Sequence, residues 1–201
     1  PIGVEELILA MNCGGSDAFS GLTANPAVGY AADLLIALGG TAVLAETPET
    51  AGAEHILTER AINQEVGQKL VSYIRWWENY FAAHTFLHPR PSMDNNPSHG
   101  NKAGGLTTIV EKSLGAVAKG GSSMLNHVLD YAEKIPSKSG LCFMDTPGKD
   151  SSSMTGLVAG GANIGVFTTG RGNVAGWAPV PTIKICTNTS TYERLTGDMD
   201  L

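Results

Sequence analysis

The chain has 201 residues, of which 42% are hydrophobic and 16% are charged, with 25 glycines and a formal net charge of −6. This composition is typical of a globular domain with a buried sheet and many tight loops, and it excludes a disordered or fibrous chain. The acidic balance, without any Lys/Arg cluster, argues against nucleic-acid binding. No apolar run reaches the length of a membrane span, so we expect no membrane partner.

The three cysteines lie far apart in the sequence, and any pairing leaves one of them unpaired. We therefore expect reduced thiols and a cytoplasmic location. Cys142 and Cys186 lie inside apolar strands and are expected in the core. The chain begins at Pro1 without Met and ends at Leu201 just after the start of an expected helix, which indicates part of a longer protein.

The first third of the sequence predicts a β-α-β unit. Residues 6–12 form an apolar run closed by Cys-Gly-Gly, typical of a buried strand that leads into a loop. Asn25-Pro26 offers an N-cap followed by proline, and a helix is expected over residues 26–38 before Gly39-Gly40. Residues 41–45 predict the next buried strand, and such a unit favours a parallel sheet with a right-handed crossover.

The middle of the chain predicts helices and one long loop. Residues 59–82 predict a long helix in which the adjacent Trp76 and Trp77 cannot share a face. We expect one of them in the core and the other against a neighbouring domain or subunit, which is compatible with a homodimer. Residues 83–105 predict a polar loop whose length suggests a function. Two further helices are predicted, over residues 106–119 and 124–133.

The last third repeats the strand pattern, with buried strands predicted over residues 140–145, 163–168 and 182–187. The first two of these strands end in polar loops, Thr146–Asp150 and Thr169–Asn173. Five strands with intervening helices indicate an α/β fold, which we expect to be a single three-layer Rossmann-like domain with a mainly parallel sheet.

Open parallel sheets bind ligands outside the carboxyl ends of their strands, and the loop Cys13-Gly14-Gly15-Ser16-Asp17 follows the first strand. Cys13 could ligate a divalent transition metal, and Asp17 could bind a metal or a substrate hydroxyl. The glycine amides could face an anion. The alternative is a phosphate-type turn above an inert, buried cysteine. The absence of GxGxxG argues against a dinucleotide site.

Glu46, Glu49 and His55 follow the second strand and are suited to cation ligation or proton transfer. Because Glu46 ends an otherwise apolar strand, its carboxylate is expected at the rim of the crevice. We favour functional roles for Glu46 and His55. The alternative is that Glu49 charges a helix start while His55 lies on the exposed face of that helix.

Two further loops carry cations that suit a substrate carboxylate. Lys102, in the polar turn of residues 96–105, could hold a carboxylate or act as a base, although a solvated loop is the alternative. Arg171 follows a strand and the hydroxyl of Thr169, and its alternative is an exposed residue of a tight turn. The histidines at positions 84, 88 and 127 are expected at or near the surface, outside any metal site.

Four stretches are recognisable together: CGGSDAFSGLTANPAVGYAADLL (13–35), AETPE…EHILTERAINQEVG (45–67), NPSHGNKAGGLTTIVEKSLGAVAK (96–119) and VFTTGRG (166–172). They resemble the galactarate dehydratase/altronate dehydratase family of sugar-acid dehydratases. The match corresponds to the C-terminal region of that family, whose small N-terminal β domain and middle segment are missing. His99 stands where the family motif has proline. Residues 82–94 and 146–153 match poorly, and we expect them to set substrate choice.

The resemblance implies loss of water from an aldaric or aldonic acid, giving a 2-keto-3-deoxy acid, with a divalent metal. Fe²⁺ is the first expectation, and Mn²⁺ and Mg²⁺ are the alternatives. A metal stabilises the enediolate, a base takes the α-proton and an acid assists the departing hydroxyl. The expected metal ligands are Cys13 and Glu46, and the expected catalytic residues are His55 and Lys102. The expected substrate-binding residues are Gly14, Gly15, Ser16, Asp17, Asn101, Thr169 and Arg171.

Two other functions stay open at this point. One is a related lyase acting on another hydroxy acid, such as sulfolactate. The other is a non-catalytic scaffold or interface domain completed by the missing N-terminal part. We expect the partners to be a small-molecule sugar acid and the N-terminal domains of the same protein, and we expect the chain alone to be inactive.

Overall fold

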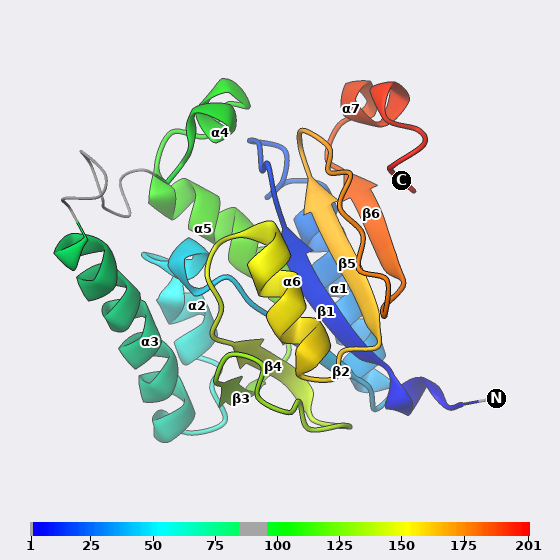
Figure 1. Cartoon of the computed structure of the whole chain (residues 1–201). Coiled ribbons are helices and arrows are strands. Elements are labelled where there is room, and N and C mark those ends of the chain that lie inside the picture. The colour runs from blue at the N-terminus through cyan, green and yellow to red at the C-terminus, as the bar shows by residue number, and fades with distance from the viewer. Residues whose placement is uncertain (1, 85–95) are drawn as a thin grey trace.

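The computed structural model describes residues 2–84 and 96–201 and shows a six-stranded sheet between two layers of helices (Figure 1). The strand order is β3-β4-β2-β1-β5-β6, and every neighbouring pair is parallel. The strands are β1 (Ile8–Cys13), β2 (Thr41–Leu44), β3 (Leu125–Leu129), β4 (Gly140–Met144), β5 (Ile164–Thr169) and β6 (Thr182–Cys186). The α/β class with a parallel sheet is confirmed, and the sheet has one strand more than the expected five.

The helices are α1 (Ala24–Ala37), α2 (Glu54–Thr58), α3 (Gln64–Ala83), α4 (His99–Ala103), α5 (Ile109–Val117), α6 (Asp150–Ala159) and α7 (Thr189–Arg194). Short 3₁₀ turns precede β1 (η1, Val4–Glu6), follow β2 (η2, Thr47–Thr50) and follow α5 (η4, Ala118–Gly120). In Figure 1, α6 lies in front of the sheet and α1 behind it. Among the described residues, no helix is both long and apolar enough to cross a membrane.

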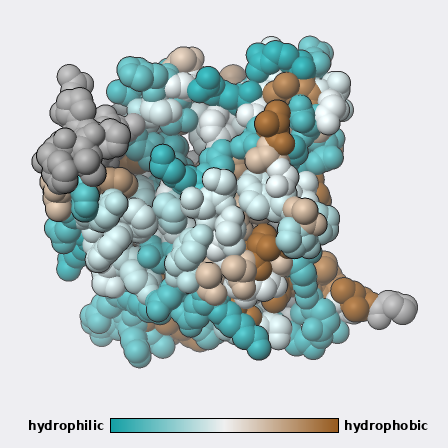
Figure 2. All heavy atoms as spheres, in the orientation of Figure 1, coloured by the Kyte–Doolittle hydropathy of each residue, from teal (hydrophilic) through white to brown (hydrophobic). Residues whose placement is uncertain are grey.

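Alternate side chains of β1 serve two separate hydrophobic cores. Met11 packs into the core shared with α1, α2, α3 and α5, whereas Ala10 packs into the core shared with α6. Residues buried on both faces explain why the strands read as continuous apolar runs. On the face drawn in Figure 2, hydrophobic side chains lie in small separate groups among hydrophilic ones.

The prediction of a helix over residues 124–133 is wrong, because this segment contains the edge strand β3. Leu125 and Val128 are buried, and β3 pairs in parallel with β4. The residues that follow read as helical, but Ala132 has a φ of 59° in a turn. Pairing with a distant strand therefore overrides the local preference of this segment.

The predicted helix over residues 26–38 is confirmed as α1, but it begins two residues earlier and Asn25 is not its cap. Asn25 is buried and accepts a hydrogen bond from Thr168 Oγ1 at 2.6 Å. Its Nδ2 donates to the carbonyl of Gly115 at 2.8 Å. This side chain therefore joins α1 to β5 and α5.

The long predicted helix begins at Gln64 because Asn63 caps it and accepts from the amide of Val66. As expected, its two tryptophans lie in different environments. Trp77 is half-buried and its Nε1 donates to Asp145 Oδ1 at 2.8 Å, whereas Trp76 is 53% exposed. The predicted loop over residues 83–105 contains the short helix α4. His88, in the same stretch, lies outside the described residues.

The three cysteines are free thiols, as expected. Cys142 is buried in the core. Cys186 is only half-buried, which corrects its expected core position, because β6 is an edge strand. His127 is exposed on β3, and His84 follows the end of α3.

Candidate metal centre and acid-binding site

The loops after β1 and β5 meet at the carboxyl edge of the sheet. The chain leaves β1 for β2 on one side and later returns as β5 on the other, so this is the topological switch point where open α/β sheets bind ligands. The amide of Gly14 donates to the carbonyl of Thr168 at 3.1 Å, and the amide of Gly170 donates to that of Gly15 at 3.2 Å. These bonds fix the two loops against each other.

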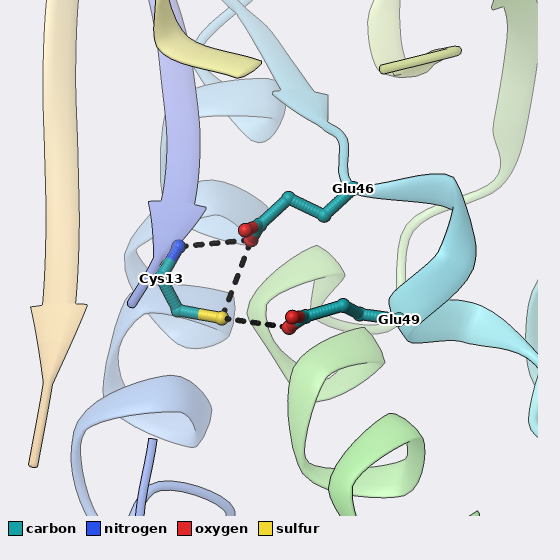
Figure 3. A group of neighbouring side chains, drawn as sticks. All are labelled: Cys13, Glu46 and Glu49. Carbon is teal, nitrogen blue, oxygen red and sulfur yellow. Dashed lines mark hydrogen bonds between the residues drawn. The ribbon is translucent and has the colours of Figure 1, made fainter. Parts of the chain in front are cut away.

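Cys13, Glu46 and Glu49 point toward one another beside this switch point (Figure 3). Cys13 Sγ lies 3.3 Å from Glu46 Oε2 and 3.8 Å from Glu49 Oε2. The backbone amide of Cys13 also donates to Glu46 Oε2, at 2.9 Å. All three residues are buried, and one ligand atom from each lies within 4.8 Å of the others. We call these three residues the donor group.

Glu46 reaches the donor group through an unusual backbone. Its φ of 69° and ψ of 58° lie in the left-handed region, and its amide donates to Thr146 Oγ1 at 2.9 Å. A residue with a Cβ in this region costs on the order of 1–3 kcal/mol and persists only where its surroundings enforce it. The η2 turn that follows then places Glu49 beside the same sulfur.

Two buried lysines face the donor group. Lys119 Nζ lies 2.9 Å from Cys13 Sγ and 3.6 Å from Glu46 Oε2. Lys112 Nζ donates to Glu49 Oε1 at 2.6 Å and to Asn96 Oδ1 at 2.7 Å. Since an unpaired buried charge is costly, each ammonium both requires and stabilises its acidic partner.

The electrostatics of this centre follow from burial. Burial and the charge of Glu46 raise the pKa of the Cys13 thiol to about 12, although Lys119 opposes them. Burial and the neighbouring Glu49 raise the pKa of Glu46 to about 7. Burial alone would lower the pKa of Lys119, but Cys13 and the carboxylates raise it overall. The Lys119 ammonium therefore donates to sulfur, and the thiol donates to Glu46.

The donor group fits a divalent transition metal. One sulfur and two carboxylates suit Fe²⁺ or Mn²⁺ better than Mg²⁺, which prefers oxygen ligands alone. The spacing of the three ligand atoms is compatible with one shared ion. A metal would need the Cys13 thiolate, so its binding would release the thiol proton. Cys13 and Glu46 as ligands stay predictions, to which the geometry adds Glu49.

A cavity of about 560 Å³ lies between the β1–α1 loop and α5. Ser16, Asp17, Thr108 and Lys112 are among its lining residues, so the buried lysine of the site borders it. A larger groove, of about 990 Å³, runs along α2 and α3 and is lined mainly by neutral polar residues. Neither lining includes a member of the donor group, but that of the smaller cavity includes Lys112, which pairs with Glu49.

Several of the predicted substrate-binding residues are brought together around this edge. Asn101 Nδ2 donates to the carbonyl of Ser16 at 2.7 Å, which joins α4 to the β1 loop. Arg171 reaches α4, since a Cβ built on Gly100 would lie 1.7 Å from its Nη1. Thr169 Oγ1 accepts from the amides of its own turn, including Arg171 at 3.2 Å.

Asp17 makes mainly structural contacts. Its Oδ2 accepts from Thr187 Oγ1 at 2.8 Å and from Asn188 Nδ2 at 3.1 Å, and its Oδ1 accepts from Ser20 Oγ at 3.0 Å. Asp17 therefore ties the β1 loop to the end of β6. Its predicted role in substrate binding is not tested by these contacts.

The two predicted catalytic residues lie apart from the donor group. His55 is exposed on α2, and Lys102 is exposed on α4. Neither makes a hydrogen bond to Cys13, Glu46 or Glu49 in the part of the chain that the structure describes. Their catalytic roles stay predictions.

The sequence interpretation missed Lys112 and Lys119 and favoured His55 over Glu49. A signal for the lysines is nonetheless present. Lys112, Ala116 and Lys119 are spaced i, i+4, i+7, so both lysines share the buried face of α5 and its η4 extension. No such spacing marks Glu49, whose position depends on the strained junction after β2.

Fold and site together define an α/β protein with a buried cysteine and two buried carboxylates at the switch point of a parallel sheet. The chain belongs to the family described as D-galactarate/Altronate dehydratase, C-terminal, which matches residues 4–201. The expected family is thereby confirmed.

Three relatives show how far the similarity extends. The chain is 46% identical over 196 residues to galactarate dehydratase (L-threo-forming) of Escherichia coli (strain K12), covering 98% of this chain and 36% of the relative. It is 47% identical over 192 residues to altronate dehydratase of Bacillus subtilis (strain 168), covering 96% and 37%. It is 37% identical over 202 residues to (2R)-sulfolactate sulfo-lyase subunit beta of Chromohalobacter salexigens, covering 100% and 51%. The chain thus spans between about a third and a half of these relatives.

Proposed function

We propose that this chain forms the metal-binding and acid-binding part of a hydro-lyase. The proposed reaction removes water from a sugar acid of the galactarate or altronate type and gives a 2-keto-3-deoxy acid. The observation that carries the proposal is the buried donor group with its two lysines, at the switch point of a chain from this dehydratase family.

A proton next to a carboxylate is very weakly acidic, so the chemistry needs a group that stabilises the negative charge formed when this proton is removed. A divalent metal bound by Cys13, Glu46 and Glu49 would supply a Lewis acid that stabilises the enediolate. Lys112 borders the cavity and carries a positive charge that can attract a substrate carboxylate. Its bonds to Glu49 and Asn96 hold that charge in place.

Further substrate contacts come from the loops around the cavity. Ser16 lines it, and Asn101 fixes the loop that carries Ser16. We propose that the guanidinium of Arg171, against α4, and the exposed ammonium of Lys102 bind substrate carboxylates from the outer side. His55 is kept as a candidate acid or base, although it is exposed on α2.

We further propose that the chain acts in the cytoplasm as part of a longer protein. Its three free thiols support a reducing compartment. The relatives' greater length supports additional domains, and we expect the chain alone to bind its metal but not to turn over substrate. Dimerisation through the outer face of α3 stays a prediction.

The test is a steady-state screen of the complete protein against aldarates, aldonates and sulfolactate, with product detected as a 2-keto acid or as released sulfite. We expect turnover of a sugar acid, loss of turnover after chelation, and recovery with Fe²⁺ or Mn²⁺. Turnover of sulfolactate alone would favour the related sulfo-lyase activity, which one relative's name supports. Turnover that survives complete removal of metal would contradict the role of the donor group.

The same screen tests the exposed candidates. His55→Ala and Lys102→Ala should each lower turnover of the preferred acid if their predicted roles hold. Glu59→Gln, an exposed change at the end of α2, serves as the control. Near-normal turnover in His55→Ala would remove His55 from the catalytic set.

A further inference from the structure

Asp150 approaches the loop after β1 from the opposite face of the sheet. It is the first residue of α6, which packs on the face away from α1 and α5 (Figure 1). Its carboxylate lies directly against the backbone of Gly14, since a Cβ built there would be 2.3 Å from Asp150 Oδ2. Gly14 follows Cys13 in the sequence, so Asp150 contacts the residue next to a member of the donor group.

One oxygen of this carboxylate is fixed by the β5–β6 loop. Asn173 Nδ2 donates to Asp150 Oδ2 at 2.7 Å. The orientation of the Asn173 amide is itself set, because its Oδ1 accepts from the amide of Ala175 at 2.7 Å. In the part of the chain that the structure describes, Asp150 Oδ1 accepts no hydrogen bond from another residue. Asn173 therefore positions one oxygen of the carboxylate, and among the described residues the only further hydrogen bond to it comes from the amide of Asp150 itself.

The surroundings of Asp150 belong to the site. Its carboxylate is half-buried and lies within the electrostatic influence of Glu49 and Lys112. Burial, the largest cause, and Glu49 raise its pKa, and Lys112 and Asn173 oppose them. Such a group, partly withdrawn from water beside other site residues, meets the usual description of an acid–base residue.

From this placement we propose that Asp150 is the base that takes the α-proton of the substrate acid. This role rests on the proposed hydro-lyase function. The α-C–H bond breaks and its proton goes to Asp150 Oδ1, while its electron pair forms the enediolate. That pair then expels the β-hydroxyl, which leaves as water with a proton from an acid or from solvent. The resulting enol tautomerises to the 2-keto acid.

The first test is Asp150→Asn in the complete protein, with Ser151→Ala, an exposed change on the same turn, as the matched control. The amide keeps an oxygen that can accept from Asn173 but cannot serve as the base. We expect kcat to fall by about 100- to 10,000-fold, with the dissociation constant of the substrate acid nearly unchanged. A fall of less than tenfold, or a loss confined to substrate binding, would overturn the proposal.

The second test is Asp150→Glu, which keeps the carboxylate but misplaces it. We expect a slower enzyme whose primary isotope effect with α-deuterated substrate is larger than that of the wild type, because proton transfer becomes rate-limiting. A slower enzyme with an unchanged isotope effect would show a merely structural role and overturn the proposal. If the wild-type protein turned over no sugar acid at all, the proposed function itself would fall, and the role of Asp150 with it.

Discussion

Glu46 and Asp33 are both carboxylates that accept hydrogen bonds from backbone amides, yet their pKa values move in opposite directions. Burial raises that of Glu46 to about 7, with Glu49 adding to the effect. Burial also acts to raise that of Asp33, but hydrogen bonds from Ser122 and Ser123 outweigh it and lower the pKa. Asp33 lies on α1 and fixes the turn before β3, whereas Glu46 follows the end of β2.

This difference separates a structural carboxylate from one suited to bind a ligand. Asp33, near the amino end of the sheet, has enough donors to stay charged. Glu46, at the carboxyl end, is buried beside Glu49 and shares Lys119 with the Cys13 thiol. Perturbed groups of the second kind concentrate at functional sites. The same chemical group, a carboxylate, is thus stabilised in its charged form at Asp33 and shifted toward its protonated form at Glu46.

The largest effect should come from removing the cation of the buried centre. In metal-free protein, Lys119→Met leaves Cys13 and Glu46 without their ammonium partner, and we expect a loss of about 3–5 kcal/mol in the free energy of unfolding. Lys69→Met is the control, because its ion pair with Asp130 lies at the surface and should contribute under about 1 kcal/mol. Urea denaturation measures both. Equal losses of stability in the two variants would contradict the distinction between the buried and the surface ion pair.

A smaller effect should follow pH. The pKa of Glu46 is raised in the folded state from 4.5 to about 7, so folding favours its protonated form. The contribution of Glu46 to the free energy of unfolding is fully present below its pKa in the unfolded chain. It is lost as pH rises through its pKa in the folded protein. We expect metal-free protein to lose up to about 1.4 kcal/mol per pH unit within that window. Denaturation between pH 5 and 8 should show a flatter profile for Glu46→Gln, and an unchanged slope would count against this assignment.

The smallest effect should come from the structural carboxylate. Asp33→Ala removes the hydrogen bonds to Ser122 and Ser123, and we expect a loss of about 1 kcal/mol at neutral pH. Because the pKa of Asp33 is lowered, its contribution is present above its unfolded value of 3.8 and disappears as pH falls through the folded value. Thermal unfolding of Asp33→Ala beside Glu78→Gln, an exposed change on α3, measures it. A loss of stability in Asp33→Ala that persisted in strong acid would contradict the lowered pKa of Asp33.

Much of the fold could be predicted because its signals are local. The apolar runs of β1, β2 and β5 and the Gly-Gly after α1 mark their elements directly. β3 could not be recognised, since its identity depends on pairing with β4. Position at a strand end was enough to select Cys13 and Glu46 as candidates.

The rest of the site depends on contacts that sequence spacing does not encode. Their spacing places Lys112 and Lys119 on one face of α5 and its extension, but only the tertiary arrangement shows that this face is buried. Asp150 follows a different strand and reaches Gly14 from across the sheet. Their selection therefore required the tertiary arrangement.

The left-handed backbone of Glu46 has a consequence for the timing of ligand binding. The strain at this junction is incurred once, when the chain folds, and it leaves Glu46 and Cys13 already in contact. An arriving ion would meet donors whose conformational freedom is already lost, so association need not include the entropy of gathering them. Selectivity would then depend on how readily each ion gives up its own water. Cations that exchange their water slowly would be disfavoured first by a low rate of association and only then by a low affinity.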